Sequence, residues 1–346
     1  MRRLHSLASI LPLLVLVAAS PAQVRLPVTI GGRVIAEAGG SFTFGWPGVY
    51  FEGRFRGTAV RVVFDAPAEH LRLLIDGKVT RVFRKPGKAD VVIDRLPSGD
   101  HRIRLEKLTE SQTGGARFHG FFPAAGSKPL PTRPRKRQIE FIGDSYTVGY
   151  GNSSATRTCT PEQIHDTTDT QQAFGPIVAR HFDADYRINA YSGFGIVRNY
   201  GGSSSGLSLP TLYPRLKPDD PAHLEAANAG WRPQVIVINL GTNDFSTPLK
   251  AGEPWADQEA LRAAYRARYA AFISDLGRRQ PQARFILMAS DKFFSDVEAV
   301  AASLNKVAGV KVIQFNGLDL GGCDWHPSLA DDLKLASLVQ QAIGPY

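Results

Sequence analysis

The hydrophobic pattern of this chain changes once, between residues 123 and 138, and this change constrains the fold more than any other feature. From Val24 to Pro123, short β-rich runs alternate apolar and polar residues and are broken by glycines. A period of two is typical of half-buried antiparallel strands, and the Asp76-Gly77 pair indicates a hairpin turn. No long helical period occurs there. We therefore expect a β-sandwich of the jelly-roll type over residues 24–123.

Residues 124–137 separate the two patterns. The stretch contains three prolines, Pro129, Pro131 and Pro134, so we expect a stiff linker without regular structure. It also carries a basic cluster, Arg133, Arg135, Lys136 and Arg137, which we interpret as a solvated charged segment.

From residue 138 to 346, apolar runs alternate with amphipathic segments. The expected strands are Ile139–Ile142, Tyr186–Ala190, Val235–Leu240, Phe285–Ala289 and Val310–Phe315. The expected helices are Thr170–His181, Gln258–Leu276, Asp296–Ala308 and Ser328–Ala342. This alternation predicts an α/β domain, a parallel sheet with helices on both faces. Ligands bind such sheets outside the carboxyl ends of the strands, so the chemistry should lie there.

A serine follows the first of these strands directly, in Gly143-Asp144-Ser145. At a strand-to-helix turn its hydroxyl faces the crevice, and its own N–H can help to hold an oxyanion. The alternative is an ordinary tight turn in which Asp144 caps a helix.

Three further segments complete a possible acyl-transfer site. Gly193 follows the second strand and could donate its N–H, while Asn243 follows the third and could donate its side-chain amide. His326 precedes a proline and the last expected helix, and an imidazole has a suitable pKa for a general base. Each segment alone could be only a turn, but all four occur in one order, each at a strand end or in a loop.

These four segments resemble the signature blocks of the SGNH (GDSL) hydrolase superfamily over residues 138–346. Four features are similar to carbohydrate esterase family 2. They are the preceding sandwich, Gly149-Tyr150-Gly151, Ser192-Gly193-Phe194-Gly195 and Asp324-Trp325-His326-Pro327. The resemblance implies a serine esterase that removes acetyl groups from polysaccharides such as xylan or glucomannan through an acyl-enzyme. It implies Ser145 as nucleophile, His326 as base, and an oxyanion hole of Ser145, Gly193 and Asn243.

The last block departs from the usual pattern. Most SGNH hydrolases place an aspartate three residues before the histidine, where this chain has Cys323. Asp324 is an uncertain third member of the triad. The alternative is a backbone carbonyl, with that of Trp325 as the candidate, because Nδ1–H needs only an acceptor for Nε2 to face the serine.

Aromatic residues near these blocks could form a platform for a sugar. The candidates are Trp325, Tyr191, Phe194 and, from the sandwich, Trp46. For each, packing in the core is the alternative.

The N-terminus has the pattern of a secretory signal. Arg2 and Arg3 precede an apolar run, and Ser20-Pro21-Ala22 offers small residues for cleavage after Ala22. We expect residues 1–22 to be removed and the protein to be secreted or periplasmic; an uncleaved anchor is the alternative. The apolar run is too short to span a bilayer comfortably, so no membrane insertion is expected.

The chain has two cysteines, Cys159 and Cys323. In an exported protein two cysteines suggest one disulfide, here between the loop after Ser145 and the loop that carries His326. Two unpaired thiols are the alternative.

The composition limits the classes of protein and of binding partner that remain. With 43% hydrophobic and 21% charged residues the chain should fold, and a net charge of +9 raises the question of anionic partners. Because the excess charge is partly local to the linker, we expect no nucleic-acid partner; loose attachment to an acidic polysaccharide or membrane surface stays open. We also expect no cofactor and no metal, since no His/Cys/Asp cluster has zinc-ligand spacing, and a monomer.

Two other functions remain open from the sequence. The same fold could serve a lysophospholipase, thioesterase or lipase, because fold does not determine substrate. The protein could also bind an acetylated glycan with little turnover, although the presence of Ser145, Asn243 and His326 argues for an enzyme.

Overall fold

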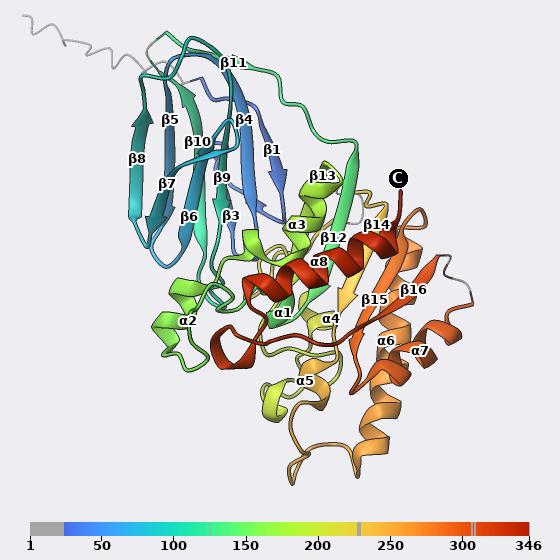
Figure 1. The fold of residues 1–346 in the computed structure, drawn as a ribbon. Coiled ribbons are helices and arrows are strands. Elements are labelled where there is room, and N and C mark those ends of the chain that lie inside the picture. Colours follow the sequence, from blue (N-terminus) through green and yellow to red (C-terminus); the bar gives the residue numbers. More distant parts are fainter. Residues whose placement is uncertain (1–23, 125, 227–229, 306, 308, 346) are drawn as a thin grey trace, which may run out of the picture.

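The computed structural model describes residues 24–124, 126–226, 230–305, 307 and 309–345. Two domains follow one another along the chain and contact each other over a broad interface (Figure 1). The first is made of antiparallel sheets and the second of a parallel sheet covered by helices. The expected signal peptide, residues 1–22, lies outside the described residues. Within them, no helix is long and apolar enough to cross a membrane.

The N-terminal domain consists of two antiparallel sheets that pack face to face. In one sheet the strand order is β1 (Val28–Gly31), β4 (Tyr50–Gly57), β9 (Gly99–Lys107), β6 (His70–Ile75), β7 (Lys78–Arg84). In the other it is β2 (Ile35–Ala36), β3 (Phe42–Phe44), β10 (Ala116–Pro123), β5 (Val60–Ala66), β8 (Gly87–Ile93). Along β5 buried and half-buried residues alternate, as the period of two predicts.

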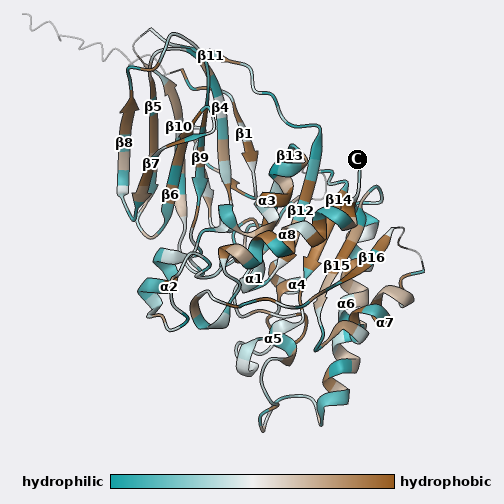
Figure 2. Ribbon diagram, viewed as in Figure 1, coloured by the Kyte–Doolittle hydropathy of each residue, from teal (hydrophilic) through white to brown (hydrophobic). Residues whose placement is uncertain are grey.

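The C-terminal domain is built on a five-stranded parallel sheet. Its order is β13 (Ala184–Ala190), β12 (Arg137–Gly143), β14 (Val235–Asn239), β15 (Arg284–Ser290), β16 (Val310–Phe315). Figure 2 shows β14 and β15 as strongly hydrophobic, which is typical of strands buried on both faces. All five expected strands are confirmed to within two residues at each end.

Helices cover both faces of this sheet. One face packs against α3 (Phe174–His181) and α8 (Leu329–Ile343), and the other against α6 (Gln258–Arg279) and α7 (Phe294–Ser303). The expected helix at residues 170–181 is divided into a 3-10 turn, η1 (Thr170–Gln172), and α3. The helix expected at 296–308 corresponds to α7, which begins earlier, at Phe294, and ends at Ser303. Ala308 lies outside the described residues.

Short helices occupy the loops at the carboxyl ends of the strands. They are α1 (Ser145–Val148), α2 (Pro161–Thr167), η2 (Tyr200–Gly202), α4 (Leu209–Leu212), α5 (Thr242–Phe245) and η3 (Cys323–Trp325). These loops carry the site residues that the sequence predicts.

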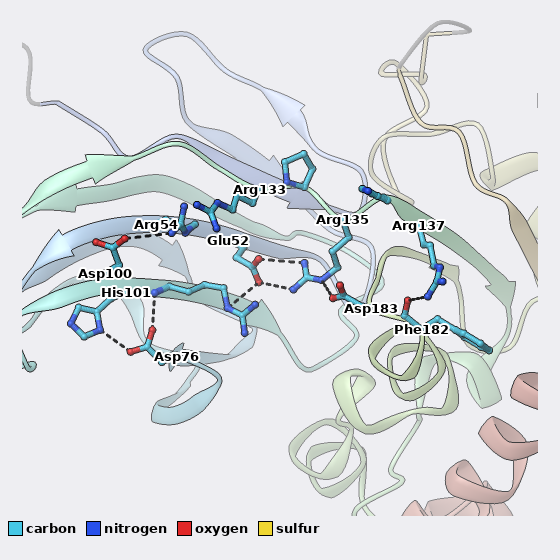
Figure 3. A pocket seen from close by; sticks show the side chains of 13 residues that line it. Glu52, Arg54, Asp76, Asp100, His101, Arg133, Arg135, Arg137, Phe182 and Asp183 are labelled. Atoms are coloured by element: carbon cyan, nitrogen blue, oxygen red, sulfur yellow. Dashed lines mark hydrogen bonds and ion pairs between the residues drawn. The ribbon is translucent and has the colours of Figure 1, made fainter. Parts of the chain in front are cut away.

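The stretch between the two patterns differs from the linker that we expected. Residues Lys128–Leu130 form an edge strand, β11, that pairs with β4, a position where a proline is tolerated. Arg135 is not a solvated charge, since it binds Glu52 of the sandwich and Asp183 of the other domain (Figure 3). It also binds Asp185 of the other domain. The stretch therefore helps to hold the domains together.

Candidate active site

Ser145 and His326 meet at the carboxyl end of the parallel sheet. Ser145 is the first residue of α1, directly after β12, and Asp144 caps this helix by accepting a hydrogen bond from the Tyr146 N–H. The Nε2 atom of His326 lies 2.9 Å from Ser145 Oγ. The helix-cap interpretation of Asp144 and the nucleophile interpretation of Ser145 are thus compatible.

Backbone carbonyls hold the His326 ring. Its Nδ1 lies 2.9 Å from the carbonyl oxygen of Cys323 and 3.2 Å from that of Asp324. The expectation that the Trp325 carbonyl takes this part is wrong. Asp324 and Trp325 both adopt positive φ, at 49° and 60°, and this tight turn directs the two earlier carbonyls at the ring.

The carboxylate of Asp324 has another partner. It accepts a hydrogen bond of 3.3 Å from the Tyr150 hydroxyl, whereas Asp324 reaches His326 Nδ1 through its backbone. The Tyr150 ring packs on the imidazole, with 4.3 Å between ring centroids. The sequence analysis named Tyr150 only within the Gly149-Tyr150-Gly151 resemblance and assigned it no role in the site.

Burial lowers the pKa of His326 below its usual value. The two carbonyls and the nearby Asp324 carboxylate partly offset this effect because they stabilise the protonated ring. The imidazole is therefore neutral near pH 7 and can accept a proton from Ser145.

Three donors surround the space in front of Ser145. Ser145, Gly193, Asn243 and His326 line one cavity of about 930 Å³. Within the described part of the chain, the N–H groups of Ser145 and Gly193 donate to no acceptor. The Asn243 amide donates to the Phe194 carbonyl at 3.0 Å and to Asp144 at 3.3 Å. An incoming oxyanion would find two free N–H groups, whereas the Asn243 amide would have to give up or share one of its two acceptors.

Asp244 braces the loop that follows Gly193. Its carboxylate accepts three backbone N–H groups, those of residues 196–198, at 2.9 to 3.0 Å. Burial raises the pKa of Asp244 to about 6, while these hydrogen bonds lower it. Glycine is required at 195, because a Cβ there would lie 2.4 Å from the Asp244 carboxylate.

The sandwich domain supplies one wall of the cavity. The loop between β9 and β10 contributes Glu110, Ser111, Gln112 and Thr113. Glu110 accepts the Ser192 N–H at 2.9 Å, and the Gln112 side chain donates to the Ser192 carbonyl at 2.8 Å. The turn that presents Gly193 is therefore held on both sides by the other domain, which the sequence did not indicate.

The aromatic candidates divide into buried and exposed residues. Trp46 is completely buried and donates to the Arg215 carbonyl, so its proposed role as a sugar platform is wrong. Tyr191 is also buried, with its hydroxyl on the Gln112 carbonyl, and Phe194 packs against it with 4.5 Å between ring centroids. Phe194 is half-buried, and neither ring lines the cavity.

The exposed aromatic residues are Trp325 and Tyr200. Trp325 is 55% exposed beside the base, where the Arg157 guanidinium lies over its ring, but it does not line the cavity. Tyr200 is 59% exposed and does line it. The sequence missed Tyr200 because its position in a glycine- and serine-rich loop gave no periodic signal.

The predicted disulfide is confirmed. Cys159 and Cys323 are bonded, and their Cα atoms lie 5.6 Å apart. The bond joins the loop before α2 to the turn that holds His326. Because the Cys323 carbonyl is also an acceptor for His326 Nδ1, the bridge anchors the base itself.

Comparisons with known proteins agree with this site. Residues 139–336 match the family described as GDSL-like Lipase/Acylhydrolase, and residues 30–132 match Carbohydrate esterase 2 N-terminal. The chain belongs to the GDSL-like hydrolases and, among them, to carbohydrate esterase family 2, and it is a carboxylic ester hydrolase.

Individual relatives resemble the chain over nearly its whole length. An acetylxylan esterase / glucomannan deacetylase of Cellvibrio japonicus is 49% identical over 326 residues, which cover 91% of this chain and 89% of the relative. A solved carbohydrate esterase, described as having an active site with divergent catalytic and non-catalytic binding functions, has a TM-score of 0.87 and 48% identity, covering 92% and 97% of the two chains. A family two carbohydrate esterase from Clostridium thermocellum in complex with cellohexaose has a TM-score of 0.79 and 28% identity, covering 92% and 98%.

Proposed function

We propose that this protein is an exported deacetylase that removes O-acetyl groups from a polysaccharide of the xylan or glucomannan kind. The observation that carries the proposal is the 2.9 Å contact between Ser145 and His326 in a cavity that Gly193 and Asn243 also line. The Cellvibrio relative named for acetylxylan and glucomannan supports the substrate class.

The reaction proceeds through an acetyl-enzyme. His326 Nε2 takes the proton of Ser145 Oγ, which attacks the acetyl carbonyl and forms a tetrahedral oxyanion. The N–H groups of Ser145 and Gly193 and the Asn243 amide hold this oxyanion. The proton on His326 then passes to the departing sugar hydroxyl. Water, deprotonated by the same imidazole, hydrolyses the acetyl-enzyme.

A Ser-His dyad is sufficient for this chemistry. The carbonyls of Cys323 and Asp324 fix the tautomer that places the Nε2 lone pair toward Ser145. A backbone carbonyl carries only a dipole and stabilises the imidazolium less than a carboxylate in contact with it would. The Asp324 carboxylate is bonded to Tyr150 instead, so its charge acts on the ring only from a distance. We assign Asp324 a supporting electrostatic role.

The lining of the cavity favours sugars over long acyl chains. Its aliphatic members are Ala68, Pro161 and Ile164, and the rest are mostly hydroxyl, amide, carboxyl and imidazole groups. A long acyl chain needs an apolar groove, whereas a glycan is held by hydrogen bonds and by exposed aromatic rings such as Tyr200.

Three further features are part of the proposal. From β3 to β10 the chain changes sheet at every step except from β6 to β7, which supports a jelly-roll topology for the sandwich. The basic and apolar N-terminus, together with the disulfide, supports export after cleavage near Ala22. We also propose that the protein acts as a monomer, because the cavity is completed by residues of one chain.

The test is acetate release from acetylated xylan and glucomannan and from nitrophenyl esters of increasing acyl length. The mature protein should release acetate and prefer the shortest ester, and Ser145→Ala should abolish turnover. Ser153→Ala, an exposed serine nearby, is the matched control and should retain activity. Preference for long acyl chains would favour the lipase alternative. Glycan binding without hydrolysis of any ester, in a folded protein, would favour the binding-protein alternative.

A further inference from the structure

Two histidines and an aspartate from different domains come together beside the catalytic cavity. His70 belongs to β6 of the sandwich, whereas His165 and Asp166 belong to α2. One ligand atom from each of the three lies within 4.8 Å of the others. The sequence showed no such cluster, because His70 is remote from the other two along the chain.

The separations suit a metal ion better than hydrogen bonds. His70 Nε2 lies 3.3 Å from Asp166 Oδ1, and His165 Nδ1 lies 3.4 Å from the same oxygen. Ligands at about 2.0–2.1 Å from a tetrahedral zinc ion are about 3.3 Å apart. A strong charge-assisted hydrogen bond would be about 2.7–2.9 Å long.

Both histidines direct a ring nitrogen at the same carboxylate oxygen of Asp166. The His70 side chain is only 4% exposed. The His165 ring packs edge-on against that of His70, with 4.8 Å between ring centroids, and its Nδ1 faces the Asp166 carboxylate.

Rigid elements hold the three side chains. The His70 backbone N–H donates to the Thr109 hydroxyl at 3.0 Å, and the carbonyl of His70 accepts the Leu108 N–H at 2.9 Å. The helix α2 begins with a Thr160 capping box, directly after the disulfide-bonded Cys159. A site assembled on such supports loses little conformational entropy when an ion binds.

We propose that His70, His165 and Asp166 bind a divalent transition-metal ion of the zinc class, which links the sandwich to α2 at the wall of the catalytic cavity. Two imidazoles and one carboxylate are a ligand set that zinc accepts, with water in the fourth position. Because His165 also lines the cavity, the ion would fix one wall of the substrate cleft.

The test measures zinc binding to the full mature protein, prepared without a polyhistidine tag and freed of metal by a chelator that is then removed. Calorimetric titration with zinc chloride should show one ion per chain. The melting temperature should rise by roughly 5 °C when zinc exceeds its dissociation constant a hundredfold. In His165→Ala and Asp166→Asn, zinc should bind at least tenfold more weakly or not at all, and the melting temperature should rise correspondingly less. Both variants change partly exposed side chains and should fold.

Two controls separate this cluster from other histidines. His223→Ala removes an exposed histidine that has its own aspartate, Asp220, at 2.8 Å but no third ligand, and should bind zinc as the parent does. His326→Ala should also retain the ion. Binding that is absent at hundreds of micromolar zinc, or unchanged in either cluster variant, would overturn the proposal, as would binding that is lost with His326.

Discussion

Glu110, in a loop of the sandwich domain, accepts a 2.9 Å hydrogen bond from the backbone N–H of Ser192, the residue before the proposed oxyanion donor Gly193. The accessory domain therefore makes direct contact with the loop that lines the catalytic cavity. It positions part of the site, and burial raises the pKa of the Glu110 carboxyl that does so.

Glu110→Ala should lower kcat about tenfold or more. The variant leaves the Ser192 N–H without its acceptor, which costs about 1–3 kcal/mol, and frees the turn that presents Gly193. Glu110→Gln retains an acceptor oxygen and should recover most of the activity. Steady-state kinetics on a small acetyl ester measure this, with melting temperatures recorded in parallel. An unchanged kcat in a destabilised Glu110→Ala protein would show that the contact is only structural.

Asn243→Ala should lower kcat by about 10²–10³ with a smaller effect on KM. The amide stabilises the oxyanion, which exists only in the transition state and the tetrahedral intermediate. The matched control is Asn316→Ala, which removes an exposed amide outside this cavity. A loss below threefold would remove Asn243 from the oxyanion hole.

The acidic limb of the pH profile of kcat/KM should have its midpoint below the usual histidine value of about 6.5. The reason is that only neutral His326 can act as base, and burial lowers its pKa. Asp324→Asn should move the midpoint further down, because it removes a negative charge that favours the protonated ring. A midpoint above 7 would contradict the buried dyad.

Removal of the disulfide should destabilise the protein and impair the base. The bond spans 164 residues, for which the chain-entropy relation gives roughly 5 kcal/mol as an upper value. The Cys159→Ala/Cys323→Ala double variant should melt up to roughly 10 °C below the parent and turn over more slowly. A reductant should lower the melting temperature of the parent but not of this variant. Equal stability in both would contradict the anchoring role.

The free energy of unfolding should decrease as pH rises from about 6 to 8, in part because the Asp332 carboxyl loses its proton. Burial raises the pKa of this carboxyl to about 8, although it accepts hydrogen bonds from Asn152 and from the Phe174 N–H. A group whose pKa is higher in the folded state than in the unfolded state contributes stability at low pH and loses it as pH rises through the folded value. The loss approaches about 1.4 kcal/mol per pH unit for one such group.

Asp332→Asn should flatten this dependence, because an amide has no proton to lose. Unfolding by urea at pH 6, 7 and 8 measures the slope of the free energy of unfolding. Asp291→Asn, at an exposed position, is the control and should keep the parental slope. Equal slopes in the parent and Asp332→Asn would show that Asp332 is already ionised when folded.

Local patterns were enough to predict the main strands and helices of the second domain and much of the site. The buried face of α6, with Leu261, Tyr265, Tyr269, Phe272 and Leu276, follows from a helical period, and the five strands follow from apolar runs. Ser145, Gly193, Asn243 and His326 could be predicted to lie together because the carboxyl ends of parallel strands meet at one edge of a sheet.

What the sequence by itself determined, then, is the class of each domain, the residues at the strand ends and the pairing of the two cysteines. Only the tertiary structure decided that Trp46 is core, that Glu110 supports the oxyanion turn, that carbonyls orient His326, and that His70 lies against α2. The physical reason is that these relationships join segments that are remote along the chain or use backbone atoms. A carbonyl is present at every residue, so only its direction in the folded chain distinguishes the one that holds the base.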